Sequence, residues 1–376
     1  MEIKDIKYLL ALGFLPLIGS ITARKLISYT GSAEAVFSEK KKNLLKIPGI
    51  GLILAENASR KDVLDKAEKE LEVIEKLKIS VKTIYDNDYP ERLKQCADAP
   101  LILFYKGSNL FNASRILSVV GTRNATEYGT DMCQRLIRDL SELSDDILIV
   151  SGLAYGIDYQ AHTAALRNGL KTVAVLAHGL HTLYPHAHKN LANKIEQNGS
   201  LVTDFSTMDD PERNNFLKRN RIIAGMSDAT IVIESGKKGG SLITADLALS
   251  YNRDVFAIPG RVSDTMSEGC NALIRDNKAA LIEGVKDIEF FLGWGSSKTG
   301  SIPRQGTLFL NLTPDEESIV SILQKEDKLS PDIISIRSGM PVSRVSATLL
   351  GLEFKAVISV MRGNIIRLNS GNRDRK

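Results

Sequence analysis

The chain has 376 residues, which is enough for two or three domains. Hydrophobic residues make up 43% of it and charged residues 25%, as is typical of globular proteins in water. The formal net charge of +4 excludes a bulk polycation, so any contact with nucleic acid has to come from a localised basic patch.

The cysteines and the hydropathy pattern exclude further classes. Cys96, Cys133 and Cys270 are far apart and form no C-x-x-C pair, which argues against a disulfide framework and against a cysteine-rich zinc site. No apolar run reaches the roughly 18 residues of a membrane span, and residues 1–5 carry acids where a signal peptide is basic. We therefore expect a cytoplasmic protein that makes no membrane contact.

Residues 1 to about 80 have a helical pattern, which is strongest at 61–79. Within this region, 15–19 (LPLIG) and 47–51 (IPGIG) each precede an apolar helical stretch. Hydrophobic-Pro-x-hydrophobic-Gly before a helix is the pattern of a helix-hairpin-helix, in which glycines let the backbone approach a DNA phosphate. We predict a helical domain of this type (SAM-like) over 1–97, and the pattern leaves open whether it binds DNA or docks a protein.

From about residue 100 to 292, apolar runs alternate with helical patterns. This alternation predicts right-handed βαβ units and a parallel, Rossmann-like sheet over 98–295, flanked by a further strand at 101–105. The predicted strands are 116–120, 147–150, 172–177, 200–204, 229–233 and 254–258, and the predicted helices are 126–143, 157–168, 188–197, 214–225, 241–251 and 268–277.

Three glycine-rich segments lie at turns from a predicted strand to a predicted helix. They are 120–123 (VGTR), 151–158 (SGLAYGID) and 239–245 (GGSLITA). Backbone N–H groups at such turns face one crevice, a geometry that suits phosphate. Neither a P-loop sequence nor G-x-G-x-x-G after the first strand is present, so we expect no nucleotide cofactor.

The last eighty residues form a separate region. Residues 296–312 are rich in Gly, Ser and Thr and are typical of a linker. Thr313 and Pro314 are expected to cap a new helix, and two further helices (331–338 and 343–354) and a hairpin (356–360 with 365–368) follow. This order predicts a winged-helix domain over 313–370, followed by a basic tail at 371–376.

Basic residues gather beside the predicted turns. Arg123 stands at the mouth of the first turn, where a guanidinium can add a bidentate contact to a phosphate. Segment 213–221 contains Arg213, Asn215, Arg219 and Arg221 but no acid, which favours an anion-binding surface over an ordinary solvated helix face.

The sequence contains no clear pattern for a metal site or for a catalytic site. His178, His181, His186 and His188 match no common zinc spacing, so we expect no metal there. Asp158 begins a helix whose dipole stabilises the carboxylate and makes it a weak base, and with His162 it is expected to form a capping and packing pair. No nucleophile elbow and no pair of carboxylates with an acid–base logic is present, so no catalytic residue is assigned.

Taken together, these segments resemble the DNA-processing protein A family (DprA or Smf) over essentially the whole chain. The resemblance is carried by 120–123 (VGTR), 151–158 (SGLAYGID) with Ala161 and His162, 173–176 (VAVL) with Gly179-Leu180 and Tyr184-Pro185, 219–225 (RNRIIAG), 240–245 (GSLITA), and 255–260 (VFAIPG) with Gly269-Cys270.

The resemblance implies a non-enzymatic protein that binds single-stranded DNA, protects incoming DNA and loads the recombinase RecA during natural transformation. It implies a homodimer whose interface includes Leu273 and Ile274, and no cofactor. It further implies that DNA phosphates are held by Gly121, Thr122, Arg123, His186, Lys189, Arg213, Asn215, Arg219, Arg221, Gly240 and Ser241.

The sequence departs from the family pattern at four positions. Thr122 replaces a serine, Tyr155 replaces an arginine and His181 replaces an aspartate. His186 stands where some members use a lysine for DNA, and the nearby Lys189 is a candidate substitute. These changes alter the local charge but not the overall pattern.

Two other functions stay open. A related α/β fold hydrolyses the glycosidic bond of nucleoside monophosphates with P-G-G-x-G-T-x-x-E, and the comparable turn here (KGGSLITAD) offers only Asp246 as the acid. The third hypothesis is a DNA-repair adaptor in which the helix-hairpin-helix and winged-helix regions carry all DNA binding.

Overall fold

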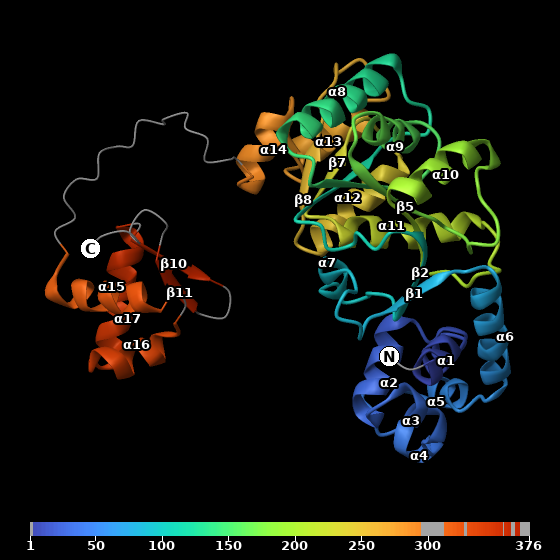
Figure 1. The fold of residues 1–376 in the computed structure, drawn as a ribbon, viewed down its shortest axis with the longest axis horizontal. Coiled ribbons are helices and arrows are strands. Elements are labelled where there is room, and N and C mark those ends of the chain that lie inside the picture. The colour runs from blue at the N-terminus through green and yellow to red at the C-terminus, as the bar shows by residue number, and fades with distance from the viewer. Residues whose placement is uncertain (1–2, 295–311, 327–328, 356, 362–364, 369–376) are drawn as a thin grey trace. The chain divides into compact units, whose positions relative to one another are not determined.

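The structure is a computed structural model that describes residues 3–294, 312–326, 329–355, 357–361 and 365–368 (Figure 1). The chain divides into two compact units, 1–295 and 296–376, and each is described by itself. The predicted linker, apart from residue 312, and the predicted basic tail lie outside the described residues. None of the described helices is both long and apolar enough to span a membrane.

The first unit begins with six helices whose apolar side chains join the same buried cluster as one face of the sheet that follows. Gly19 and Gly51, the last residues of the two predicted hairpin turns, are the N-caps of α2 and α5, so a helix follows each turn as expected. Leu9, Leu26 and Leu44 are fully buried in this core. The helices are α1 (Ile3–Gly13), α2 (Ser20–Thr30), α3 (Ala33–Ser38), α4 (Lys41–Leu44), α5 (Leu52–Ala58) and α6 (Asp62–Lys76).

A nine-stranded sheet follows, in the order β1-β2-β6-β5-β4-β3-β7-β8-β9. The seven strands from β6 to β9 in this order are parallel. At one edge β2 pairs antiparallel with β6, and β1 pairs antiparallel with β2. The strands are β1 (Ser80–Thr83), β2 (Ile102–Gly107), β3 (Arg115–Val120), β4 (Ile147–Ser151), β5 (Lys171–Val175), β6 (Ser200–Thr203), β7 (Ala229–Val232), β8 (Asp254–Ala257) and β9 (Ala280–Leu281).

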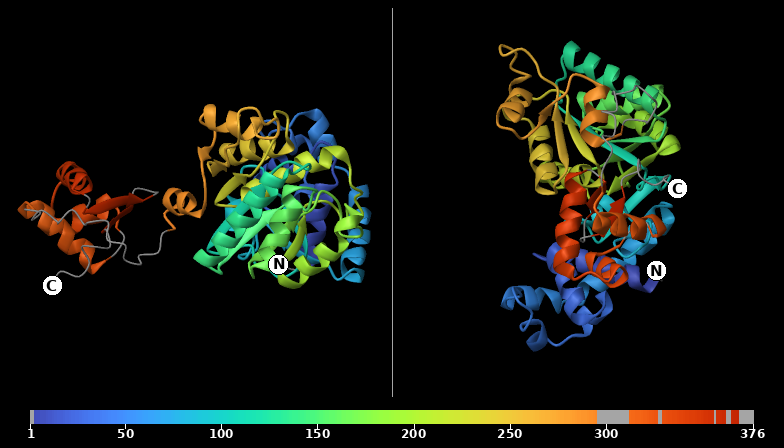
Figure 2. Two further views of the ribbon diagram at one scale, coloured as in Figure 1. Left: turned by 90° about the horizontal axis from the view of Figure 1, so that it is seen from above. Right: turned by 90° about the vertical axis from the view of Figure 1, so that its left-hand side faces the viewer.

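Helices cover both faces of this sheet, as Figures 1 and 2 show. Leu117 and Val119 of β3 belong to the apolar cluster of α8, α9 and α14, while Ile116 and Val120 belong to the cluster of α11 and α12. This alternation follows from the two-residue period of a strand. The helices are α7 (Glu91–Lys94), α8 (Glu127–Leu143), α9 (Ile157–Arg167), α10 (Lys189–Asn198), α11 (Arg213–Met226), α12 (Gly240–Ser250), α13 (Glu268–Arg275) and α14 (Val285–Leu292), with a 3₁₀ turn η1 (His186–His188) before α10.

The predicted parallel core is confirmed. Each of the six strands and six helices predicted between residues 116 and 277 is present, with ends that differ by no more than two residues. The short edge strands β1 and β9 were not predicted, because a four-residue and a two-residue strand carry too little alternation to stand out. The division of this unit at residue 97 stays a prediction.

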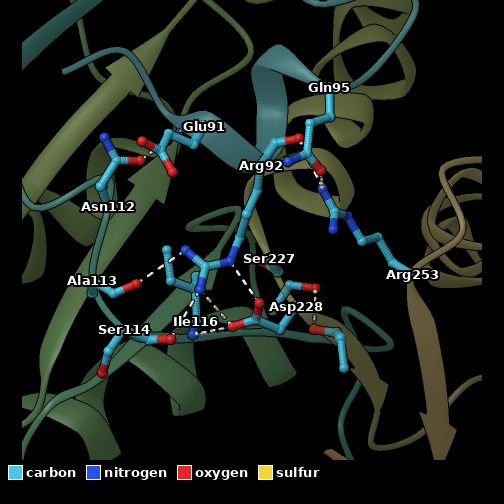
Figure 3. A network of polar contacts seen from close by, with 12 residues as sticks. Glu91, Arg92, Gln95, Asn112, Ala113, Ser114, Ile116, Ser227, Asp228 and Arg253 are labelled. Carbon is cyan, nitrogen blue, oxygen red and sulfur yellow. Dashed lines mark hydrogen bonds and ion pairs between the residues drawn. The ribbon is translucent and has the colours of Figure 1, made fainter. Parts of the chain in front are cut away.

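A polar network fixes the short helix α7 to the sheet (Figure 3). Arg92 of α7 donates from Nε and a terminal nitrogen to both carboxylate oxygens of Asp228, at 2.6 and 3.0 Å. The same guanidinium donates to the carbonyls of Ala113 and Ser114, and Asp228 also accepts from the amide of Ile116 at 2.8 Å. Since Ile116 lies in β3 and Asp228 directly precedes β7, α7 is tied to the amino-terminal ends of two central strands.

The second unit has the element order of a winged helix: α15 (Pro314–Lys325), α16 (Pro331–Ser338), α17 (Val342–Phe354), β10 (Ile358–Met361) and β11 (Ile365–Leu368). Thr313 caps α15 and forms a capping box with Glu316, as predicted. Arg337 pairs with Glu326, Arg344 with Asp315 and Lys355 with Glu316. The last two pairs neutralise cations on and just after α17, the helix that reads DNA in many winged helices.

Candidate nucleic-acid interface

The predicted turns meet at a crevice of about 710 Å³ in the first unit. It lies where β3 separates β4, β5 and β6 on one side from β7, β8 and β9 on the other, and such switch points are the usual ligand sites of open α/β sheets. Four cations and one carboxylate border it, so the crevice is electropositive. These residues are Arg123, Arg213, Arg219, Lys238 and Asp158.

Arg123 projects from the loop that follows β3. Its side chain is exposed, and its guanidinium carbon lies 5.1 Å from the centre of the Phe216 ring. Phe216 in turn packs edge-on against Tyr184, at 5.8 Å between ring centres. The mouth of the crevice therefore combines a guanidinium, which binds phosphate, with two aromatic rings, which can stack on unpaired bases.

The backbone of the Arg123 loop is held from two sides. The amide of Thr122 donates to the carbonyl of Glu234 at 2.7 Å, and the carbonyl of Thr122 accepts from the amide of Ile157 at 3.1 Å. Gly156 has φ of 73°, and a Cβ there would lie 2.2 Å from the carbonyl oxygen of Thr122. A larger residue at position 156 is thus excluded both by its backbone angle and by the close approach of the loop.

Glu234 lies two residues after the end of β7. It holds the end of the Arg123 loop that leads into α8. Its side chain is 2% exposed and accepts from the amide of Thr126 at 2.9 Å and from the hydroxyl of Thr126 at 2.6 Å. Thr126 is the N-cap of α8 and accepts from the amide of Gly129. A carboxylate of the chain itself therefore occupies the N-terminus of α8, where we had expected a phosphate.

The N-terminus of α12 borders the crevice directly. Gly239 is its N-cap, and Gly240 and Ser241 are its first residues. The first N–H groups of a helix have no intrahelical acceptor, and the exposed Lys238 stands beside them. The predicted Gly240-Ser241 turn is thus suited to an anion, and Lys238, which we had not assigned, adds a fourth cation.

Arg219 forms the buried wall of the crevice. It is 3% exposed, and one terminal nitrogen donates to the carbonyl of Gly152 at 2.6 Å and to that of Val175. Burial lowers the pKa of Arg219 to about 10, an effect that the charge of Asp158 opposes. A Cβ at Gly152 would overlap this guanidinium, so Arg219 shapes the crevice more than it offers an exposed charge.

Asp158 lies at the start of α9, as expected. Its surroundings raise the pKa of the carboxyl group, whereas the helix dipole was expected to lower it. Burial raises the pKa of Asp158, while Arg219 and the amide of Ala154 lower it by a smaller amount. The expectation that the helix dipole governs this carboxylate was wrong, because the cost of removing it from water is larger. The expected pair with His162 is not formed either, since Nδ1 of His162 is 2.7 Å from the hydroxyl of Thr172.

Two predicted contacts on α11 lie away from the crevice. Arg221 pairs with Asp204 and donates to the carbonyl of Asp98, on the side of the helix that faces α7. Two residues along a helix correspond to a rotation of about 200°, which places Arg221 opposite Arg219. Asn215 is 8% exposed, donates to the carbonyl of Asp210 and does not border the crevice, so both assignments are corrected.

His186 and Lys189 are exposed but border a different, smaller cavity of about 330 Å³, together with Lys106 and His181. The other histidines of this loop bond to the chain itself: Nδ1 of His178, His181 and His188 lies 2.7–2.9 Å from a backbone carbonyl. Within the described residues, no three histidines, cysteines or carboxylates are placed to share a metal ion. A DNA contact by His186 or Lys189 stays a prediction.

Leu273 and Ile274, the two residues predicted for the homodimer interface, differ in exposure. Leu273 is 5% exposed and belongs to the core, whereas Ile274 is partly buried against it. Leu273 therefore cannot meet a partner in this conformation, and its assignment is corrected. Ile274 is the member of the pair that reaches the surface.

His162 gives the first unit a pH-dependent stability. Thr172 donates its hydroxyl hydrogen to the carbonyl of Ile149, so Nδ1 of His162 carries the proton and the buried Nε2 has no partner among the described groups. Burial lowers the pKa of His162 to about 3, from about 6.5 when unfolded. The contribution of His162 to the free energy of unfolding is complete above about pH 6.5 and is lost progressively below it. The loss is about 1.4 kcal/mol between pH 7.5 and 5.5.

The measurement is urea unfolding at both pH values, followed by the fluorescence of Trp294, the single tryptophan, which packs on the same cluster as α9. His162→Gln removes the titrating group, so this variant should lose about 1.4 kcal/mol less than the parent chain over the same interval. An equal loss in both proteins would show that other groups carry the pH dependence.

Comparisons with known proteins agree with this architecture. The family model of DNA recombination-mediator protein A matches residues 80–292, and that of the DprA winged helix domain matches residues 310–364. A putative DNA processing protein DprA of Mycobacterium tuberculosis is 33% identical over 337 residues, which cover 86% of each protein. The protein Smf of Escherichia coli is 35% identical over 288 residues, which cover 74% of this chain and 75% of the relative.

Two solved structures are similar as well. The X-ray structure of DNA processing protein A from Streptococcus pneumoniae has a TM-score of 0.64 and 34% identity, over 75% of this chain and 96% of that one. A structure of DNA processing protein A from Helicobacter pylori, described for its single-stranded DNA binding mode, has a TM-score of 0.51 and 28% identity, over 57% and 95%.

Proposed function

The chain belongs to the DNA recombination-mediator protein A family, and we propose that it binds single-stranded DNA in the crevice at the carboxyl ends of β3 and β7. The observation that carries this proposal is the arrangement at the crevice mouth. Arg123 lies on Phe216, with Arg213, Lys238 and the N-terminus of α12 around the same opening. These groups match a phosphate backbone, and the rings of the exposed Tyr184 and the half-buried Phe216 match unpaired bases.

The test is anisotropy of a labelled oligo-dT and of a duplex of the same length, titrated with the full chain over a series of salt concentrations. We expect the single strand to bind more tightly, since stacked and paired bases cannot reach Phe216 and Tyr184. The affinity should fall with salt at a log–log slope near −0.7 for each neutralised phosphate. Equal affinity for the duplex would count against the crevice and for the terminal regions as the binding site.

In the cell, we propose that this binding protects incoming DNA and loads RecA onto it in natural transformation, as the resemblance implies. Loading is measured as faster RecA filament formation on an oligo-dT in the presence of the chain. We also propose a homodimer that includes Ile274, which light scattering of the purified chain would detect. A chain that is monomeric at every concentration would contradict it.

We propose a binding role rather than catalysis. Asp246, the acid that a nucleoside-monophosphate hydrolase would need, is exposed and pairs with Lys278 at 2.8 Å. It does not border the crevice. Release of free base from nucleoside monophosphates by the purified chain would overturn this part of the proposal.

A further inference from the structure

A second basic cavity lies in the first unit, between α2 and α7, and has a volume of about 640 Å³. We call it the α2–α7 hollow. Three cations border it: Arg24 and Lys25 of α2, and Lys94 of α7. No carboxylate is among its lining residues.

The charges of the hollow are uncompensated, unlike those around it. Neighbouring cations of the same region are paired with acids, as in Lys7–Glu68, Lys41–Glu56 and Lys82–Asp88. Among the described ion pairs, none includes a cation of the hollow. Three convergent positive charges without acids repel each other, and such an arrangement is typical of a site that binds an anion.

The hollow is held in shape by Arg24. One of its terminal nitrogens donates to the carbonyls of Cys96 and Ala97, at 3.3 and 3.2 Å, so α2 is tied to the segment that follows α7. Because α7 is itself fixed to the sheet by Arg92 and Asp228, both walls belong to one body. The cavity is therefore preformed, which lowers the entropic cost of binding.

An aromatic ring completes the lining. Tyr85 is 47% exposed at the edge of the hollow. Partial burial raises the pKa of Tyr85, so at neutral pH its hydroxyl keeps its proton and can donate to a phosphate while the ring can stack on a base. Cations combined with an exposed ring are the features of a single-strand binding surface.

Both hairpin turns found in the sequence lie beside the hollow. The first turn leads into α2, and a Cβ placed on Gly49 of the second turn would lie 3.2 Å from Nζ of Lys25. A helix-hairpin-helix approaches nucleic acid with this part of its structure. The motif and the cavity thus point to the same surface.

We propose that the α2–α7 hollow is a second site for the phosphate backbone of single-stranded DNA, occupied by the same strand that enters the crevice. This inference rests on the proposed function. Helix α7 packs against α11, whose other side borders the crevice, so two helix diameters, or roughly 20 Å, separate the two sites. Successive phosphates of an extended single strand lie roughly 6–7 Å apart, well above the rise of about 3.4 Å along a duplex axis, so about four phosphates reach from one site to the other.

The length of the oligonucleotide therefore separates the two sites. The double variant Lys25→Glu/Lys94→Glu reverses two charges of the hollow and leaves the bridging Arg24 in place. For an oligo-dT of about 20 nucleotides, we expect it to lose affinity about fivefold, with a salt slope reduced by about 1.4 for two phosphates. For an oligo-dT of about three nucleotides, whose phosphates cannot span both sites, its affinity should equal that of the parent chain.

The matched control is Lys61→Glu/Lys69→Glu, which makes the same charge change at exposed positions of the N-terminal helices outside the hollow. An equal loss in this control would overturn the proposal, since general repulsion would explain it. An unchanged affinity of the hollow variant for the long strand would also overturn it and point to an acidic protein segment as the ligand. Failure of the proposed function is distinct, because Arg123→Ala would then bind the oligo-dT of about 20 nucleotides as tightly as the parent chain does.

Discussion

Replacing Arg123 with alanine is expected to lower the affinity of the chain for oligo-dT about tenfold or more. Arg123 is the exposed guanidinium at the crevice mouth, and hydrogen bonds from a charged donor to a phosphate contribute about 1.5–3 kcal/mol each. The stability of the fold should change little, because the side chain is exposed and lies on the ring of Phe216 at the crevice mouth. Anisotropy with a labelled oligo-dT measures the affinity, and urea unfolding measures the stability.

The control for this variant is Arg138→Ala. Arg138 lies on α8, is exposed and pairs with its neighbour Asp139 outside the crevice, so its loss removes the same charge from the same part of the chain. We expect its affinity to stay within about twofold of the parent chain, since distant surface charges are screened by salt. If both variants lose affinity equally, the DNA senses the overall charge of the chain rather than the crevice.

Glu234→Gln is expected to weaken single-strand binding about fivefold, although it removes a negative charge beside the site. Both carboxylate oxygens accept from Thr126, and a glutamine keeps only one of these acceptors, so the hydroxyl hydrogen of Thr126 loses its acceptor when the glutamine oxygen stays on the amide. A buried polar group without a partner costs about 1–3 kcal/mol of stability. We expect the loop that carries Arg123 to shift so that this cost is avoided, which displaces the guanidinium from its binding position. A purely electrostatic role of Glu234 predicts the opposite sign, that is, tighter binding.

A double-mutant cycle decides whether Glu234 acts through Arg123. In the Arg123→Ala background, Glu234→Gln should have almost no further effect on affinity, because the group that it positions is absent. Glu127→Gln is the matched control, since Glu127 is exposed in the first turn of the same helix. Additive losses in the cycle would show that Glu234 stabilises the crevice by another route.

The part of the site that could be predicted has local signatures. Gly156, Gly240 and Arg123 lie at turns that follow short β-branched runs, and parallel strands bring such turns to one edge of the sheet. The position of β3 next to β7 rather than only next to β4 is not visible in the sequence, yet it creates the crevice. The fold class could thus be predicted, but the exact neighbours of each turn could not.

The errors on α11 have a geometric origin. Its buried residues surround much of the helix, so the sequence lacks the polar stripe that would fix the rotation of the helix. Arg219 and Arg221 therefore look equivalent in the sequence, although one borders the crevice and the other pairs with Asp204. Glu234 was missed for a related reason: its partner Thr126 is 108 residues away along the chain, and only the tertiary structure brings them together.

The crevice joins side chains from distant parts of the chain, and this has a consequence during translation. When a ribosome has synthesised the chain as far as the end of α11, Arg123 and Arg213 have been made, but neither Glu234 nor Lys238 exists yet. Pairing of β7 with β3 is a non-local step, which forms late in folding. The nascent chain thus has the cations before it has the arrangement that binds a strand, and it can bind one in the crevice only after β7 and the start of α12 have been made and have folded against β3.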